Sequence, residues 1–304
     1  MYFTSLPDHT KPGFDEALHF SRFRKHNIIF NAESSASNCD NHVGCLSFKT
    51  VLKGEEWYGI NRQRLAVRPG QFLILNDDQN YSCRSDNGEK LKILSVFFKK
   101  EFASSVFRDA LHTESFLLDE PLNNGAQTLE FFQTLNQITP ELQLQLSGLL
   151  TALDQQGDQE NMMDEYLVFL LHQLIRTHKS AFNRVGQVAA LKPNTRTEIY
   201  KRLCVAKDIL HSTYMEHTDL AHISSLACLS VPQLVRQFKA VFRITPHQYL
   251  IRVRLKHAAD LLKFTDKPIH EITWMTGFEN VSAFCRAFKS GYGVQPVNFR
   301  KMRG

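Results

Sequence analysis

Between residues 45 and 99 the apolar positions form short runs that are separated by turn residues. The runs read CLSFKTVL, RLAV, FLIL, YSC and LKILSVFF, and the breaks between them include Pro69-Gly70, NDDQN and Asn87-Gly88. Short runs with such breaks are typical of an antiparallel sandwich or barrel. In the last run both alternating faces are apolar, as expected for a strand that is enclosed on both sides. The pattern therefore predicts a closed or double-layered sheet.

From about residue 101 the apolar spacing is helical, and it is most regular over residues 161–178. One face of this predicted helix carries Met163, Tyr166, Leu167, Leu170, Leu171 and Leu174. A stripe with this spacing is the buried face of an amphipathic helix. It packs either on its own domain or against a second copy of the chain in a dimer. The sequence leaves both uses open.

The C-terminal third of the chain repeats itself at an offset of 50 residues. A repeat of this length indicates that one small structural unit occurs twice. The matching positions are Leu234 with Phe284, Arg236 with Arg286, Phe238-Lys239 with Phe288-Lys289, Phe242 with Tyr292, Pro246 with Pro296, and Tyr249 with Phe299.

Each copy of the repeat reads as a helix, a tight turn and a second helix, over about residues 219–242 and 268–292. The first copy turns at Cys228-Leu229-Ser230 and the second at Gly277, which permits a left-handed backbone. This is the pattern of a helix-turn-helix unit, whose second helix presents its free face to a major groove about 12 Å wide. The segment IRVRLKHAADLLKF between the copies predicts one rigid helix that joins them.

Positive charge is concentrated in the same part of the chain. Residues 191–304 hold 18 Lys and Arg against 8 Asp and Glu, a net charge of +10, whereas residues 1–190 hold 18 against 23, a net charge of −5. Clustered Lys and Arg bind a polyanion favourably because they release its condensed counterions. The charge distribution favours a nucleic-acid partner for the C-terminal domain.

The sequence also limits where the protein acts and what it binds. No stretch approaches the roughly 20 apolar residues of a membrane helix, and the N-terminus lacks the pattern of a signal peptide, so a cytoplasmic protein without membrane contact is expected. None of the six cysteines forms a C-x-x-C pair, which predicts reduced thiols and no zinc site. Cys39 and Cys45, six residues apart, are a candidate redox pair, although nothing in the sequence indicates a lowered thiol pKa.

Residues 196–303 resemble the DNA-binding domain of the AraC/XylS family of transcription regulators. The residues that carry the resemblance are LSVPQLVRQFKAVFRITPHQYLIRVRLKHAADLL and IHEITWMTGFENVSAFCRAFKSGYGVQPVNFR. Two positions depart from the family pattern: Arg243 stands where the family usually has glycine, and Thr273 where it usually has alanine. The resemblance implies a regulator that binds promoter DNA, acts with RNA polymerase and forms homodimers; activation and repression are not distinguished, although activators are common.

The predicted DNA contacts lie on the second helix of each unit. Arg236 and Arg286 are equivalent, and each is expected to bind guanine or a phosphate unless it forms an internal ion pair. Lys239 and Lys289 are expected to meet phosphates. The remaining candidates are side chains beside the arginines or residues at the helix starts, where backbone amides hold phosphates: Pro232, Gln233, Val235, Asn280, Ser282 and Cys285.

Residues 20–100 resemble the cupin-like sensor domain of many family members, most clearly in LAVRPGQFLILNDDQNY. Catalytic cupins hold a metal with histidines, but residues 45–100 contain none, and Tyr81 stands about where such proteins often place one. No metal or other cofactor is therefore expected. The candidates to line a pocket for a small organic effector, or else to form plain core, are Trp57, Tyr58, Phe72, Tyr81 and Phe97.

Together these features predict an α+β protein of two domains. Residues 1–182 form a cupin-like β-barrel with following helices for sensing and dimerisation, residues 183–195 a linker, and residues 196–304 an all-α domain of two helix-turn-helix units joined by a helix. The predicted function is non-enzymatic: sequence-specific DNA binding that responds to a small organic effector. The alternatives are a regulator without an effector, a cupin-type enzyme or a DNA-repair protein, and the missing metal ligands disfavour both of the last two.

Overall fold

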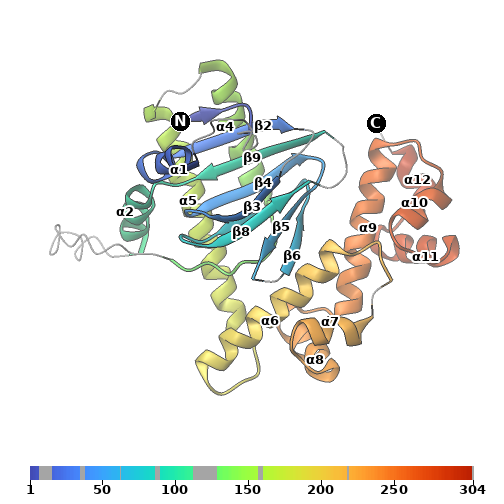
Figure 1. The fold of residues 1–304 in the computed structure, drawn as a ribbon. Coiled ribbons are helices and arrows are strands. Elements are labelled where there is room, and N and C mark those ends of the chain that lie inside the picture. Colours follow the sequence, from blue (N-terminus) through green and yellow to red (C-terminus); the bar gives the residue numbers. More distant parts are fainter. Residues whose placement is uncertain are drawn as a thin grey trace. The chain divides into compact units, whose positions relative to one another are not determined.

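The computed structural model describes residues 1–6, 16–34, 38–61, 63–85, 90–111, 129–156, 160–217 and 219–302. The chain divides into two compact units, Met1–Phe182 and Asn183–Gly304 (Figure 1). The first contains two sheets with helices, and the second is built from helices, which confirms the predicted α+β class. The predicted turn at Asn87-Gly88 lies outside the described residues.

Ten strands of the first unit form two sheets. The six-stranded sheet has the order β1 (Tyr2–Phe3), β2 (Ile28–Ser34), β9 (Leu91–Phe97), β4 (Ser47–Lys53), β7 (Gln71–Leu75) and β10 (Asn136–Gln137). The four-stranded sheet has the order β3 (Asn38–Val43), β8 (Asn80–Arg84), β5 (Glu56–Ile60) and β6 (Gln63–Val67). Neighbouring strands run antiparallel except β1 and β2, which run parallel.

The two sheets pack face to face around an apolar core. Alternate residues of β4, β7 and β9 meet alternate residues of β5, β6 and β8 there, as two packed sheets require. The members of this inner core are Ala32, Val51, Tyr58, Ile60, Leu65, Val67, Leu73, Leu75, Tyr81, Leu91, Ile93 and Leu135. The predicted double-layered sheet is therefore present, and β9 is enclosed on both sides as its sequence indicated.

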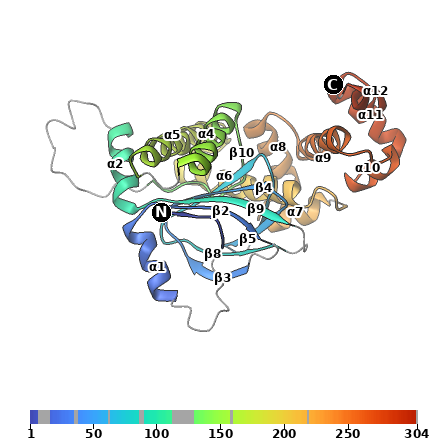
Figure 2. The ribbon, with the colours of Figure 1, turned by 90° about the horizontal axis from the view of Figure 1, so that it is seen from above.

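Helices cover the other face of the six-stranded sheet. These are α2 (Lys100–Leu111), α4 (Pro140–Gln156) and α5 (Glu160–Val185), and Figure 2 shows them on one side of the sheet with β3, β5 and β8 on the other. Sheet residues such as Phe48, Phe72 and Val96 pack against them in a second apolar core. A further helix, α1 (Glu16–Lys25), precedes β2. This unit thus has three layers.

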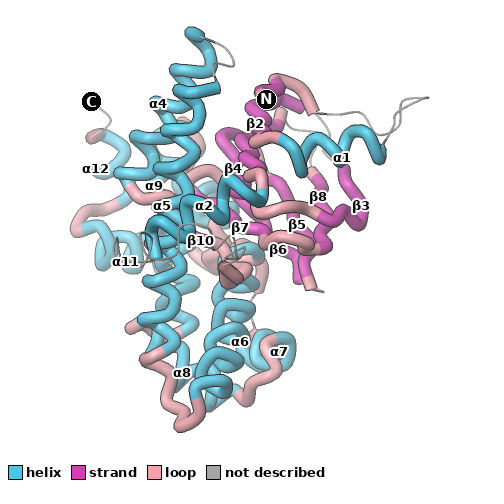
Figure 3. Tube along the Cα trace, turned by 90° about the vertical axis from the view of Figure 1, so that its left-hand side faces the viewer, coloured by secondary structure: helices cyan, strands magenta, loops and turns pink. Residues whose placement is uncertain are grey.

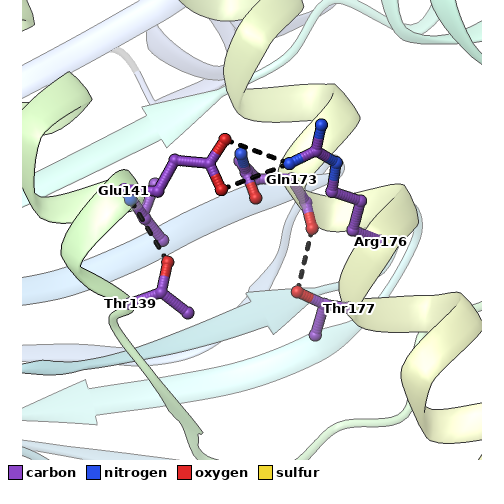
Figure 4. Close-up of polar contacts among 6 residues, drawn as sticks. Thr139, Glu141, Gln173, Arg176 and Thr177 are labelled. Carbon is purple, nitrogen blue, oxygen red and sulfur yellow. Dashed lines mark hydrogen bonds and ion pairs between the residues drawn. The ribbon is translucent and has the colours of Figure 1, made fainter.

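The apolar stripe of α5 lies in that second core. Met163, Leu167 and Leu171 are each at most 4% exposed. Polar contacts join α4 and α5 beside the core (Figure 4): the guanidinium of Arg176 donates to both carboxylate oxygens of Glu141, at 3.1 and 3.2 Å. Of the two uses that the sequence left open, the stripe therefore serves packing within its own domain.

The second unit consists of seven helices in its described part (Figure 3): α6 (Pro193–Ser212), α7 (Leu220–Leu226), α8 (Val231–Phe242), α9 (Pro246–Phe264), α10 (Ile269–Met275), α11 (Val281–Tyr292) and α12 (Pro296–Lys301). The helix α9 joins the two helix pairs, as predicted. Its N-terminus is fixed by a capping box in which Thr245 and Gln248 each bind the other's backbone amide.

The segment between α5 and α6 is shorter than the predicted linker. Residues 183–185 continue α5 and residues 193–195 begin α6, so residues 186–192 alone are non-helical. This segment is held within the second unit: Val188 is 4% exposed, and the side-chain oxygen of Gln187 accepts a hydrogen bond of 2.7 Å from Arg243. Gly186 follows the end of α5 and Pro193 begins α6, and between them Val188 is the residue that packs into the domain, whereas Leu191 is 96% exposed.

Candidate nucleic-acid interface and ligand site

Both helix pairs turn in the same way. Cys228 follows α7 with a φ of +52°, and Gly277 follows α10 with a φ of +75°. The next residue donates its amide hydrogen to a carbonyl five positions earlier: Leu229 to Ser224 at 2.9 Å, and Phe278 to Thr273 at 3.1 Å. A left-handed residue with this hydrogen bond ends a helix in a Schellman motif. The sequence repeat is therefore also a repeat of backbone geometry.

The second turn is one residue longer than the first. Ser230, the N-cap of α8, directly follows Leu229, whereas Glu279 separates Phe278 from Asn280, the N-cap of α11. Equivalent residues are consequently 49 positions apart in the first helices and 50 apart in the recognition helices, as the cap residues show. The offset of 50 found in the sequence therefore aligns the recognition helices but not the helices that precede them.

Gly277 is required by its surroundings as well as by its backbone angle. A Cβ atom there would stand 2.7 Å from the carbonyl oxygen of Tyr214 and 2.9 Å from that of Met215. Side-chain carbons essentially never approach backbone oxygens so closely. The turn of the second unit therefore packs directly on the chain that leaves α6.

The departure at Thr273 is absorbed locally. Thr273 is fully buried, and its hydroxyl donates to the carbonyl of Ile269 at 2.8 Å. Ser224, the equivalent residue of the first unit, likewise donates to Ala221 at 2.9 Å. Because each hydroxyl has a partner on its own helix, neither brings an unsatisfied polar group into the core.

The recognition helices α8 and α11 begin with matched caps. The side chain of Ser230 accepts from the amide of Gln233 at 3.4 Å, and that of Asn280 from Ala283 at 2.8 Å. Such caps satisfy amides at a helix start and leave others pointing outward, where a phosphate can bind. Pro232 lies in the first turn of α8, where its missing N–H has no consequence.

One face of each recognition helix is buried and the opposite face is open. Leu234, Phe238, Phe284 and Phe288 are fully buried. Every predicted contact residue lies on the open side. Exposed are Pro232, Arg236, Lys239, Asn280, Ser282, Arg286 and Lys289, and half-buried are Gln233, Val235 and Cys285. The structure brings the predicted residues together as two equivalent sets, one on each helix.

The two arginines at the centre of these sets make no ion pair with any described residue. Within the described part of the chain, neither Arg236 nor Arg286 forms an ion pair, so the alternative of an internal ion pair has no support. An unpaired guanidinium keeps its full set of donors for a guanine edge or a phosphate. Arg243, by contrast, is occupied by Gln187.

The departure at Arg243 affects how α8 ends. Arg243 caps the helix with a φ of +64°, and Gly293 caps α11 with a φ of +77°. A non-glycine residue in this region is strained by roughly 1 to 2 kcal/mol. The family position keeps its left-handed geometry here, and the side chain that glycine would lack reaches the segment 186–192.

In the first unit the structure separates the five predicted pocket residues. Tyr58 and Tyr81 lie together in the inner core, with ring centroids 6.2 Å apart. Phe97 also faces inward but packs with Phe23, Phe30 and Ile28. Phe72 faces the helices instead, and Trp57 alternates with buried Tyr58 and is therefore on the outer side of its sheet.

Two charged residues that the sequence reasoning missed stand beside Tyr58 and Tyr81. Lys49 on β4 is 4% exposed and Glu56 on β5 is 2% exposed. The carboxylate of Glu56 accepts a hydrogen bond of 2.5 Å from Tyr58. Burial lowers the pKa of Lys49 to about 8, although Cys83 and Glu56 partly oppose the shift. The available signal was a lysine in the middle of the predicted strand CLSFKTVL.

The cysteines of the first unit pair differently from the sequence-based hypothesis. Cys39 lies opposite Cys83 in the ladder of β3 and β8, and both are free thiols. Hydrogen bonding with Cys39, together with burial, raises the pKa of Cys83. Cys45 precedes β4, and burial raises its pKa to about 12. The ladder thus favours Cys83, not Cys45, as the partner of Cys39.

No group of three His, Cys, Asp or Glu side chains in the described part of the chain is arranged to hold a metal ion. No described helix combines the length and apolar character needed to cross a membrane.

Both units match known protein families. Residues 47–172 match the AraC-like ligand binding domain, and residues 223–302 match a helix-turn-helix domain. Together the two matches cover more than half of the chain.

The chain is also similar to individual known proteins. "Probable transcriptional regulator LumQ" of Photobacterium leiognathi is 37% identical over 27% of this chain and 33% of its own length, so this match spans about a third of that relative. An uncharacterised HTH-type transcriptional regulator of Haemophilus influenzae is 22% identical over 94% of this chain and 97% of its own. The solved C-terminal domain of AraT, a response regulator from Geobacillus stearothermophilus, is 28% identical over 34% of this chain and 85% of its own, with a TM-score of 0.33.

The sequence resemblance, the tandem helix-turn-helix geometry and the two family matches agree. The chain belongs to the AraC family of transcription regulators, with an N-terminal ligand-binding domain and a C-terminal helix-turn-helix domain.

Proposed function

We propose that this regulator binds a specific duplex sequence by placing α8 and α11 in two adjacent segments of the major groove. The observation that carries the proposal is the pair of equivalent, exposed arginines, Arg236 and Arg286, neither of which is engaged by a described residue. A recognition helix reads bases through side chains of this kind on its open face. The net charge of +10 over residues 191–304 supports the same partner.

The remaining predicted residues divide by chemistry. Gln233 suits adenine, Val235 suits the thymine methyl group, and Ser282 and Cys285 occupy the corresponding surface of α11. Lys239 and Lys289 lie about one turn further along and are assigned to phosphates. Because the side chain of Asn280 already caps α11, its contribution and that of Pro232 would come from the helix starts.

The test is selection of binding sites from random duplexes by the full chain at fixed salt, repeated with Arg236→Ala and Arg286→Ala. Each substitution should relax one part of a two-part motif by roughly 1 to 3 kcal/mol. Arg252→Ala is the control, because Arg252 is exposed on α9 outside both recognition helices. If no motif emerges and affinity only falls with salt, specific reading by these helices is ruled out under the conditions used.

We further propose that a small organic effector binds between the two sheets and that its binding changes the DNA affinity. The support is the match of residues 47–172 to a ligand-binding domain, together with the buried polar groups Lys49, Glu56 and Tyr58. In a regulator without an effector, the positions of these polar groups would be expected to carry apolar side chains, as the rest of the inner core does. The named relatives are regulators, which favours this class over an enzyme.

Homodimer formation, contact with RNA polymerase and transcriptional activation stay predictions of the family resemblance, and a cytoplasmic location stays a prediction from the sequence pattern. The stripe on α5 does not support dimerisation, because its own domain buries it. Sedimentation of the full chain with and without its selected duplex would test the homodimer.

A further inference from the structure

Lys49 projects from the middle strand of the larger sheet into the space between the two sheets. It is paired with Ser95 on β9 and with Leu73 on β7, so neighbouring strands flank it on both sides. Val51, two residues along the same strand, belongs to the inner core. With 4% of its surface exposed, this lysine does not reach bulk water as surface lysines do.

The ammonium group has aromatic neighbours but no anionic partner. Nζ lies 3.4 Å from the ring centroid of Phe97 and 5.6 Å from that of Tyr81. Among the described residues no hydrogen bond or ion pair reaches it, and the nearby carboxylate of Glu56 is bonded to Tyr58. Cation–π contacts compensate only part of the lost hydration of an ammonium ion.

A second polar group on the same strand face is also unsatisfied. Ser47 is fully buried, and its hydroxyl has no hydrogen-bond partner. Ser47 and Lys49 point the same way because they are two positions apart on β4. A buried hydroxyl without a partner is uncommon, and one on the same strand face as an ammonium group with aromatic neighbours is the arrangement of a site that a ligand completes.

The required ligand group is an anion with oxygen acceptors. A carboxylate can accept hydrogen bonds from the ammonium and from the hydroxyl at the same time, because its two oxygens offer separate lone pairs. The rest of the ligand would meet Phe97, Tyr81 and the apolar side chains of the inner core, so a small inorganic anion would leave these contacts unused.

We propose that the effector of this regulator is an organic carboxylate with an apolar or aromatic body, and that Lys49 is the residue that binds its carboxylate, with Ser47 as a second donor. This inference rests on the proposed effector site and names the chemical class that the site accepts. The relation is reciprocal: the ligand neutralises the buried ammonium, and the ammonium selects acids over neutral molecules of the same shape.

The test uses the full chain and a panel of linear and phenyl-substituted monocarboxylates of four to ten carbons, each with its primary amide, measured by thermal shift and calorimetry. The variants are Lys49→Met and, as control, Lys53→Met, which removes an exposed lysine of the same strand. Carboxylates should stabilise the wild type while amides do not. Lys49→Met should weaken carboxylate binding at least tenfold and raise the melting temperature of the unliganded protein. Lys53→Met should change neither of these and should leave DNA affinity intact.

Two outcomes would overturn the inference. If amides bind as well as acids and Lys49→Met changes neither, the site holds a neutral effector, and only the assignment of the ligand class is wrong. If no carboxylate binds and Lys49→Met lowers the melting temperature, Lys49 is structural and the inference falls. DNA affinity is measured on the same samples. If the wild type still binds its selected duplex, a negative result concerns the effector class alone and not the proposed DNA binding.

Discussion

The side-chain amide of Gln237 and the backbone of Ala189 are joined by two hydrogen bonds of 3.1 Å, one in each direction. Gln237 lies on the buried side of the first recognition helix and is 2% exposed. The segment that follows α5 is therefore bound to α8 through a residue that faces away from the predicted DNA surface.

Because of this pairing, alanine substitution of Gln237 and of Gln233 on the same helix should have different effects on stability. Gln237→Ala leaves a backbone donor and acceptor unpaired and should reduce the free energy of unfolding by about 1 to 3 kcal/mol, with faster amide exchange at Ala189. Gln233→Ala, on the open side, should leave both unchanged and alter only the selected DNA sequence. Urea unfolding and hydrogen exchange would measure the first effect. Equal stability of the two variants would contradict the assigned role of Gln237.

Two glycines with nearly the same backbone angle should respond differently to alanine. Gly277 has a φ of +75° and Gly293 a φ of +77°, but a Cβ on Gly293 would meet nothing within 4 Å. Gly293→Ala should therefore cost about 1 kcal/mol from the backbone alone. Gly277→Ala adds a clash with backbone oxygens and should cost clearly more, measured as the difference in melting temperature. Similar values for both would mean that the turn after α10 can shift freely.

The buried amine of Lys49 predicts how stability depends on pH. Its pKa falls from 10.5 to about 8 on folding, so the unfolded chain holds the proton more tightly between these values. The destabilisation is full below pH 8 and disappears as the pH rises toward 10.5, at up to about 1.4 kcal/mol per pH unit. Urea unfolding at pH 7.5, 8.5 and 9.5 should show wild type gaining stability relative to Lys49→Met. If the free energies of unfolding of wild type and Lys49→Met changed with pH in the same way, the amine would be hydrated in the folded protein.

A pair of phenylalanines separates core packing from surface effects. Phe238 is fully buried, with its ring 4.6 Å from that of Phe242, whereas Phe264 at the end of α9 is 81% exposed. Phe238→Ala should cost roughly 3 to 5 kcal/mol, and Phe264→Ala within about 0.5 kcal/mol. Thermal unfolding would compare them. Loss of DNA binding by Phe238→Ala at unchanged melting temperature would place this ring at the interface instead.

The sequence predicted the C-terminal domain closely because its determinants are local. The spacing of Leu234 and Phe238 predicts a buried helix face within about one turn, and Gly277 alone predicts the turn that follows the preceding helix. The strand β3, with the sequence NCDNHV, was missed because an edge strand of polar residues shows no apolar alternation. The strand that precedes it in the chain, β2, was missed too. It pairs with β9 over seven positions, but β9 lies some 60 residues later in the chain.

The candidate sites show the same division. The open face of α8 and α11 follows from helical spacing, so all ten DNA-contact candidates could be placed on it. The faces of strands also alternate, and that rule alone would have separated Trp57 from Tyr58. Lys49 and Tyr81 belong to different sheets and meet between them. Such contacts depend on how the two sheets are stacked, and the pattern of a single strand carries no information about that.

The open faces of the two recognition helices share their arginine and lysine but differ at the positions between. Pro232, Gln233 and Val235 of α8 correspond to Ser282, Ala283 and Cys285 of α11. Since the two recognition helices belong to one chain and carry different side chains, a single chain has a direction along the duplex. Its binding site then has polarity, and inverting that site in front of a gene would turn the whole protein around relative to the start of transcription.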